Sequence, residues 1–272
     1  MIAVIAGTGH LPVLACQKLI QQGKPFFVIT LFQEDNAEAL RIIVSNHAEV
    51  IAQDFYKPGA ILEFLKKRAT KQVLFIGKVD KQNLLKHLTY DWLALKLLGT
   101  VVTRSDKNIM EALLAELTRH GIATLRQDEV LGGLKVPPGI LCGALSDALR
   151  HDVFLGIKTA ITMAHADIGQ SVVVKDGMVL AVEAIEGTDA CIKRGLSLGG
   201  SGIVICKAAR SDQNTKFDLP TLGPASLEPF FVGDVACIAW LSSHTLIAQQ
   251  ELFVEKALSL GITLVSVGNE EL

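Results

Sequence analysis

Aromatic side chains and surplus positive charge are both scarce in this chain of 272 residues. It contains two Trp and two Tyr, and 26 Lys and Arg stand against 28 Asp and Glu, which gives a formal net charge of −2. Proteins that bind nucleic acid usually combine a basic surface with aromatic side chains for base stacking. We therefore expect no nucleic-acid partner.

Long apolar runs are also absent, although half of the residues are hydrophobic and the mean hydropathy is +0.39. Charged or polar residues interrupt each run before it reaches the roughly 20 residues that cross a bilayer as a helix. The first twelve residues contain no basic segment of the kind that opens a secretory signal peptide. We expect a cytoplasmic protein with a large buried core.

Metal-binding cysteine pairs are missing too. The sequence has no CxxC and no Cys/His cluster with zinc spacing, and its five cysteines are far apart: Cys16, Cys142, Cys191, Cys206 and Cys237. Because most of them lie within apolar runs, buried free thiols are the favoured interpretation.

The first half alternates short apolar runs with helical patterns. We expect strands at 2–6, 26–31, 49–52, 73–76 and 122–125, and helices at 11–22, 34–45, 59–69, 82–98 and 107–120. Ser105 or Asp106 is a candidate cap for the last helix. This order predicts an α/β fold whose N-terminal domain, residues 1–133, has a Rossmann-like parallel sheet.

The second half, residues 134–272, begins after a Gly- and Pro-rich stretch at 132–139. We expect strands at 171–175 and 178–183, joined by the hairpin turn Asp176-Gly177. Further strands are expected at 203–206, 235–240 and 263–267, and helices at 146–165, 188–198, 226–232 and 251–260. Thr188 is a candidate N-cap. The antiparallel start predicts a second α/β domain with a mixed sheet.

A glycine turn, Gly7-Thr8-Gly9, follows the first strand and precedes the first helix. In Rossmann-like units this position can hold a phosphate or a ribose. The dinucleotide fingerprint GxGxxG fails here because Pro12 occupies its sixth position. A tight structural turn and a nucleotide or sugar-phosphate contact both remain open, and an NAD-dependent oxidoreductase is the less favoured alternative.

Charged residues gather after the strands of the second half. Glu183, Glu186 and Asp189 follow the hairpin, and Lys207, Arg210, Lys216 and Asp218 follow the next strand. Carboxylates and cations at strand ends suit a phosphate or metal–phosphate ligand. Ordinary solvated loops would give the same pattern.

Several of these segments together resemble the LpxI-type UDP-2,3-diacylglucosamine pyrophosphatases of lipid A biosynthesis. The matching segments are IAGTGHLP at 5–12, Gly77-Lys78-Val79, Ser105-Asp106, DIGQ at 167–170, AVEAIEGTD at 181–189 followed by Arg194, and FDLPTLG at 217–223. The resemblance extends from residue 2 to about residue 268.

This resemblance implies an enzyme of a Gram-negative bacterium that hydrolyses UDP-2,3-diacylglucosamine to UMP and 2,3-diacylglucosamine 1-phosphate (lipid X). Such a reaction needs Mg²⁺ or another divalent cation, for which Asp218, Asp189 and Glu183 are candidate ligands, and a carboxylate that activates water, for which Asp218, Glu186 and Asp189 are candidates. A turn before Pro220 or an acidic helix start would also explain these carboxylates. The candidate substrate-binding residues, several of which could equally be surface charges, are Gly7, Gly9, Lys78, Gln170, Thr188, Arg194, Lys207, Arg210, Lys216 and Thr221. A homodimer and peripheral contact with the inner membrane surface are further implications.

One position departs from the family in a way that bears on activity. Asn214 stands where the family usually carries Asp, while Arg210 and Lys216 keep the charge but exchange the type of cation. Asn is isosteric with Asp, so substrate binding could survive where catalysis does not. A catalytically impaired or non-catalytic homologue that binds the nucleotide lipid is therefore the alternative function.

Overall fold

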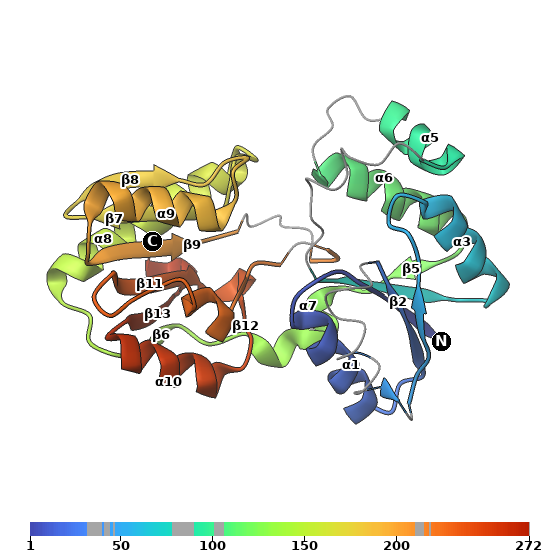
Figure 1. Cartoon of the computed structure of the whole chain (residues 1–272), viewed down its shortest axis with the longest axis horizontal. Helices are drawn as coiled ribbons and strands as arrows, with labels where there is room; N and C mark the ends of the chain where they lie inside the picture. Colours follow the sequence, from blue (N-terminus) through green and yellow to red (C-terminus); the bar gives the residue numbers. More distant parts are fainter. Residues whose placement is uncertain are drawn as a thin grey trace. The chain divides into compact units, whose positions relative to one another are not determined.

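The computed structural model describes residues 1–31, 40, 44–45, 47–77, 90–100, 106–209, 215–217 and 219–271 (Figure 1). The chain divides into two compact units, Met1–Leu131 with Thr215–Phe217, and Gly132–Asn214 with Asp218–Leu272. The short segment belongs to the first unit because the Thr215 carbonyl accepts a hydrogen bond from the Gln127 N–H at 2.7 Å. Phe217 also packs against that unit's core. Most of the helix expected at 34–45 lies outside the described residues.

The first unit is built on a five-stranded sheet in which every pairing is parallel. Its order is β3-β2-β1-β4-β5, with bounds β1 Ile2–Ala6, β2 Phe26–Thr30, β3 Val50–Ala52, β4 Gln72–Ile76 and β5 Ala123–Thr124. The three central strands are apolar except for Thr30 and Gln72, as is usual for parallel strands that are covered by helices on both faces. The expected Rossmann-like parallel sheet is confirmed.

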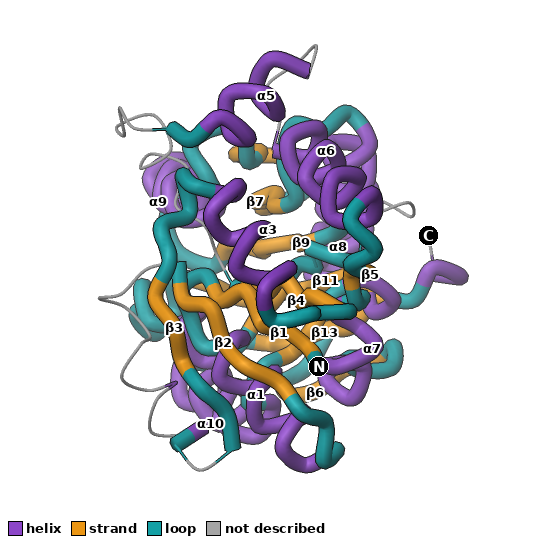
Figure 2. The backbone as a smooth tube through the Cα atoms, turned by 90° about the vertical axis from the view of Figure 1, so that its right-hand side faces the viewer, coloured by secondary structure: helices purple, strands orange, loops and turns teal. Residues whose placement is uncertain are grey.

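Helices cover both faces of this sheet (Figure 2). Their bounds are α1 Leu11–Gln21, α3 Pro58–Lys67, α5 Trp92–Thr100, α6 Asp106–Arg119 and α7 Gln127–Leu131. Leucines of α3, α5 and α6 pack with β1, β2 and β4 in one cluster, while α1 and α7 contact each other and β4. The short helix α7 was not predicted from the sequence.

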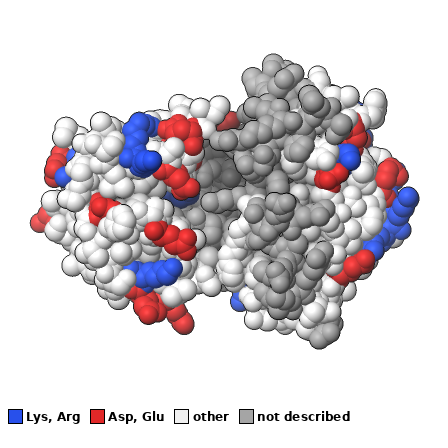
Figure 3. Space-filling view, in the orientation of Figure 1, with Lys and Arg blue, Asp and Glu red and all other residues white. Residues whose placement is uncertain are grey.

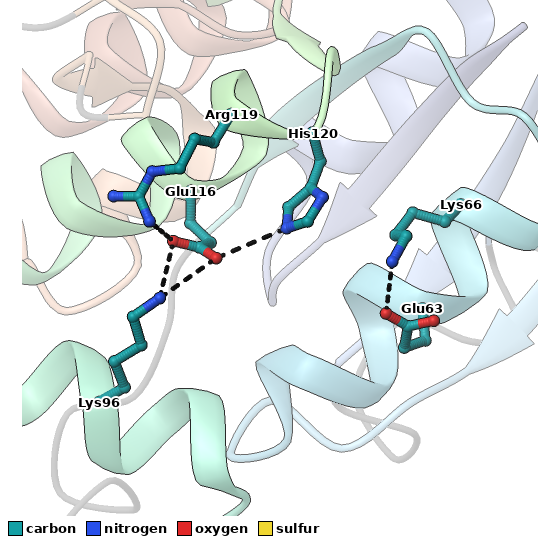
Figure 4. A network of polar contacts seen from close by, with 6 residues as sticks. All are labelled: Glu63, Lys66, Lys96, Glu116, Arg119 and His120. Atoms are coloured by element: carbon teal, nitrogen blue, oxygen red, sulfur yellow. Dashed lines mark hydrogen bonds and ion pairs between the residues drawn. The ribbon is translucent and has the colours of Figure 1, made fainter.

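A charged network joins α5 to α6 (Figure 4). The Glu116 carboxylate, whose side chain is 9% exposed, lies 3.3 Å from Lys96 Nζ, 2.7 Å from Arg119 Nη1 and 3.5 Å from His120 Nε2. Burial alone would raise the pKa of Glu116. The Lys96 hydrogen bond and the charges of Arg119, Lys96 and His120 outweigh burial, so the pKa of Glu116 is lowered.

The second unit is built on a mixed, six-stranded sheet of order β6-β13-β11-β9-β7-β8, as expected. Strands β9, β11 and β13 are parallel, whereas β7 is antiparallel to both of its neighbours and β6 is antiparallel to β13. The bounds are β6 Gly139–Cys142, β7 Ser171–Lys175, β8 Met178–Val182, β9 Ile203–Lys207, β11 Val235–Leu241 and β13 Thr263–Val267. A separate parallel pair joins β10 Thr221–Leu222 to β12 Leu246–Ile247.

Successive residues of the central strands face opposite layers. Val172 and Val174 of β7 pack with α8 (Asp147–His165), whereas Val173 belongs to the cluster on the other face, with α9 (Thr188–Gly199) and α10 (Gln250–Leu260). Helix α9 lies close to the sheet because Gly195 meets Val173, and a Cβ at 195 would be 2.6 Å from Val173 Cγ1. The start of α9 is joined to the end of β9 by the hydrogen bond from Lys207 Nζ to Thr188 Oγ1 at 3.4 Å.

Two details of the second unit differ from expectation. The helix expected at 226–232 is wrong, because only a 3₁₀ turn forms, η2 at Pro224–Leu227. Leu227 and Phe230 are buried, but Phe231 and Val232 are exposed, and the Phe231 N–H donates to Asp234 Oδ2 at 2.8 Å instead of continuing a helix. The edge strand β6 was not predicted. Of the helices in the described ranges, none combines the length and apolar character needed to cross a bilayer.

Candidate functional site

The candidate site lies at the carboxyl edge of the second sheet, where β8 and β9 end and α9 begins (Figure 1). Because β7 runs antiparallel to both strands, its first residue, Ser171, pairs with the last residue of β9, Lys207. Glu183 follows β8 directly, and Thr188 is the first residue of α9. The topology thus brings together residues that are separated by up to 36 positions, such as Ser171 and Lys207.

The Thr188 hydroxyl is the centre of a hydrogen-bonded network. It donates to Glu183 Oε1 at 2.8 Å and accepts from Lys207 Nζ at 3.4 Å. Ser171 Oγ lies 3.4 Å from the same oxygen. Because the single hydroxyl proton of Thr188 is given to Glu183, Ser171 acts as the donor to Thr188. The network fixes the Lys207 ammonium beside the first turn of α9.

Gly169 allows the loop before β7 to lie against Glu183. A Cβ at position 169 would overlap the Glu183 carbonyl oxygen and lie 2.7 Å from its carbonyl carbon. The two loops are joined by hydrogen bonds from the Gln170 N–H to Glu183 Oε2 at 3.3 Å and from the Glu183 N–H to the Ser171 carbonyl at 2.8 Å. Both oxygens of Glu183 therefore accept hydrogen bonds from within the protein.

A second charged pair supports the loop between β8 and α9. Arg194 Nη2 donates to Glu186 Oε1 at 2.6 Å and to the Val182 carbonyl at 2.9 Å. The Ala184 N–H donates to Glu186 Oε2 at 3.2 Å. Hydrogen bonding from the backbone N–H of Glu186, and then from Arg194, lowers the pKa of Glu186. Glu186 is thus a charged residue that holds the loop to α9.

The start of α9 corrects the expected cap. Gly187, not Thr188, is the N-cap residue, and its φ of +84° is a value that glycine adopts more readily than other residues. Gly187 has no side chain with which to cap the helix, and the Thr188 hydroxyl, one position further on, is bonded to Glu183. Asp189 lies in the first turn and is exposed, with no hydrogen-bond partner among the described residues.

The glycine turn of the first unit lies at the carboxyl edge of its own sheet. The Gly7 N–H donates to the Ile76 carbonyl at 2.8 Å, and a Cβ at Gly77 would lie 2.8 Å from the Thr8 carbonyl oxygen. Gly9 has a φ of +91°. These contacts pack the turn against the end of β4.

The other predicted residues are dispersed or undescribed. Lys216 is half-buried in the segment that packs with the first unit, and Thr221 Oγ1 donates to the Leu219 carbonyl at 3.3 Å in the second. Lys78, Arg210, Asn214 and Asp218 lie outside the described residues. Ser171 and Gly169 were not among the predicted site residues, although both lie at the carboxyl edge.

The described residues do not by themselves form a metal site. Within the described ranges, no group of three or more His, Cys, Asp or Glu side chains is arranged to hold a metal ion. Glu183 and Glu186 use their oxygens to accept hydrogen bonds from the protein. Asp189 is the predicted metal ligand whose carboxylate is exposed and uncommitted among the described residues.

Fold and site together define a two-domain α/β protein with a polar network at the carboxyl edge of its second sheet. Acidic and basic side chains are intermixed on the visible face of that domain (Figure 3). Family models of the LpxI N-terminal domain and the LpxI C-terminal domain match residues 1–134 and 137–265. The chain therefore belongs to the LpxI family.

A curated relative matches over nearly the whole length. It is the UDP-2,3-diacylglucosamine pyrophosphatase LpxI of Caulobacter vibrioides, which is 29% identical over 286 residues, 99% of this chain and 98% of the relative. Among solved structures, a UDP-glucose-4-epimerase from Stenotrophomonas maltophila covers 44% of this chain and 34% of its own at 18% identity and a TM-score of 0.31. An N5-carboxyaminoimidazole ribonucleotide synthetase from Thermus thermophilus covers 75% of this chain and 46% of its own at 13% identity and a TM-score of 0.28. Structural similarity this low carries no functional argument.

Proposed function

We propose that this protein hydrolyses the pyrophosphate of UDP-2,3-diacylglucosamine, giving UMP and 2,3-diacylglucosamine 1-phosphate in lipid A biosynthesis. The oxygen of water forms a bond to one phosphorus, the bond from that phosphorus to the bridging oxygen breaks, and two protons are released to solvent near neutral pH. Membership of the LpxI family and the name of the Caulobacter relative support this substrate. The observation that carries the proposal is the placement of Lys207 beside the uncapped N-terminus of α9.

The residues of the network divide between substrate contact and support. The Lys207 ammonium and the N–H groups of the first turn of α9, whose N-cap Gly187 supplies no side-chain cap, attract an anionic phosphate. Glu183 and Ser171 fix the Thr188 hydroxyl, which in turn orients Lys207. Glu186 and Arg194 hold the loop that leads into α9. The proposed role of Glu183, Ser171, Glu186 and Arg194 is therefore to position the groups that contact the substrate.

A divalent cation remains part of the proposal. When bound, such an ion would neutralise pyrophosphate charge and stabilise the charge that develops in the transition state. Asp189 is the described candidate to hold it, together with Asp218, which lies outside the described residues. Removal of divalent ions with EDTA should abolish UMP release, and Mg²⁺ should restore it. Full activity in EDTA would refute the dependence of hydrolysis on a divalent cation.

Lys207 provides the sharpest test of the site. Lys207→Met keeps the length of the side chain but removes its charge, and loss of a preorganised phosphate donor should lower kcat/KM roughly 100-fold. Lys193→Met is the matched control, because Lys193 is an exposed lysine of the same helix, α9. Equal kcat/KM values for the two variants would contradict the site.

The alternative function rests on Asn214. If the missing carboxylate impairs hydrolysis, Asn214→Asp should raise the rate of UMP release by about 100-fold or more, the usual scale of general acid–base assistance. If Asn214 is a bystander, the rate should stay unchanged. Tight binding of UDP-2,3-diacylglucosamine without UMP release from the native chain would favour a non-catalytic binding protein.

A further inference from the structure

Among the described residues of the second domain, Ile185 is the most exposed large apolar residue. Its relative exposure is 102%, so the folded chain covers none of its side chain. Single exposed apolar residues are ordinary on protein surfaces, so the position of Ile185 is what distinguishes it. Ile185 lies between Glu183 and Glu186, within the loop that connects the network to α9.

The loop that presents Ile185 is held on both sides. The Glu183 N–H donates to the Ser171 carbonyl at 2.8 Å, and the Gly187 N–H donates to the Ala184 carbonyl at 3.2 Å. Glu186 accepts from Arg194 at 2.6 Å. The apolar side chain is therefore presented by an ordered backbone, which lowers the entropy cost of binding a ligand to it.

A second exposed isoleucine lies on the neighbouring loop. Ile168 is 47% exposed and precedes Gly169, whose backbone packs directly against the backbone of Glu183. The Ile168 N–H donates to the Met163 carbonyl at 3.1 Å, which ties this loop to the end of α8. Two ordered loops in contact thus each carry an exposed isoleucine close to Glu183.

We infer that Ile185 and Ile168 form the contact for the acyl chains of the substrate, and this inference rests on the proposed function. The ligand has an anionic pyrophosphate at one end of its sugar and acyl chains on the ring. The structure offers a matching pair of surfaces, in which Lys207 and the start of α9 adjoin the loop that carries Ile185. Covering a fully exposed isoleucine with an acyl chain should strengthen binding roughly 10-fold or more.

The test compares two ligands that are not turned over, namely 2,3-diacylglucosamine 1-phosphate with long acyl chains and glucosamine 1-phosphate. Dissociation constants are measured by calorimetry for the native chain, Ile185→Ser, Ile185→Leu and the control Val232→Ser. Val232 is 74% exposed and lies on the loop that precedes β11. Ile185→Ser should weaken binding of the diacyl ligand about 10-fold and leave glucosamine 1-phosphate unchanged. Ile185→Leu and Val232→Ser should match the native chain for both ligands.

Three results would overturn the inference. The first is that Ile185→Ser weakens the binding of both ligands equally, and the second is that it weakens the binding of neither. The third is that Ile185→Ser loses self-association while lipid binding is unchanged, which would assign Ile185 to a contact between copies of the chain. UMP release by the native chain is measured separately. Ile185-dependent lipid binding without UMP release would refute the proposed function and leave the lipid contact standing.

Discussion

Replacement of Gly169 by Ala tests the packing that positions Glu183. A Cβ at residue 169 would lie 2.7 Å from the Glu183 carbonyl carbon and 2.9 Å from its Cβ, and it would overlap the carbonyl oxygen. Relief of this overlap requires the two backbones to separate by roughly 1 Å, because the opposing atoms belong to the main chain and cannot rotate away. That separation would stretch the hydrogen bonds that join Gln170 and Ser171 to Glu183.

The expected cost combines overpacking and two weakened hydrogen bonds. Overpacking of a well-packed contact costs about 1–3 kcal/mol, and each hydrogen bond contributes about 1 kcal/mol. If each hydrogen bond loses about half of its contribution, Gly169→Ala should lower the free energy of unfolding of the second domain by roughly 2–4 kcal/mol. Enzymatic activity should fall as well, because the displaced Glu183 no longer fixes Thr188.

Urea unfolding followed by tryptophan fluorescence is the appropriate assay. The chain has two tryptophans, of which Trp240 is fully buried in the second domain and Trp92 is 74% exposed on α5. In a Trp92→Phe background the signal reports the second domain alone. Gly133→Ala is the control, because a Cβ there meets no atom within 4 Å. A Gly169→Ala variant whose unfolding free energy stays within about 0.5 kcal/mol of the parent would refute the reasoning.

Three further predictions concern the Thr188 hydroxyl, the Glu116 carboxylate and the buried cysteine thiols. Thr188→Val removes the hydroxyl that links Glu183 and Lys207, so it should lower the free energy of unfolding by roughly 1–3 kcal/mol and kcat/KM about 10-fold. Thr188→Ser keeps the hydroxyl and should retain both values, and equal effects of the two substitutions would refute the network. Glu116→Gln should lower the free energy of unfolding by about 1–2 kcal/mol at neutral pH. Because the pKa of Glu116 is lowered in the native state, this loss of stability should shrink as the pH falls from the unfolded pKa through the native pKa, and a loss that stays constant down to pH 2 in urea unfolding experiments would contradict the prediction. Burial raises the pKa of Cys16 and Cys237 to about 12 and that of Cys191 to about 11. These thiols should therefore resist an aromatic disulfide reagent at pH 8 until the chain is unfolded, and rapid labelling of any of them in the native chain would contradict their burial.

Elements with a strong local signal could be predicted from the sequence. The Asp176-Gly177 turn forms with positive φ at both residues, +50° and +74°, because this dipeptide favours the conformation wherever strands flank it. Buried strands such as Ile2–Ala6 were also predicted, since continuous apolar runs have few other places in a folded chain.

The elements missed are those held by distant contacts. Helix α7 has five residues and depends on the buried side chain of Gln127, whose Nε2 donates to the Phe75 carbonyl at 2.9 Å. The edge strand β6, in the middle of the chain, pairs with β13 near the C-terminal end. The cap of α9 was wrongly assigned to Thr188 because residue preference alone does not show that the helix already begins at Thr188, with Gly187 before it as the N-cap.

The candidate site shows the same division. The carboxylates and cations of 183–207 could be selected from the sequence, and Glu183, Thr188, Gln170 and Lys207 do come together. Their roles could not be predicted, because only the fold shows that the Glu183 oxygens are already bonded and that Glu186 is paired with Arg194. Ser171 and Gly169 were missed because their importance arises from strand pairing and close backbone approach.

The measurement that tests the central claim most directly is the release of UMP from UDP-2,3-diacylglucosamine by the purified chain with Mg²⁺. The account predicts UMP and 2,3-diacylglucosamine 1-phosphate in equal amounts, a rate lowered roughly 100-fold in Lys207→Met, and an unchanged rate in Lys193→Met. Absence of UMP while the folded chain binds the substrate would contradict the proposed hydrolysis. Release at the native rate by Lys207→Met would contradict the site.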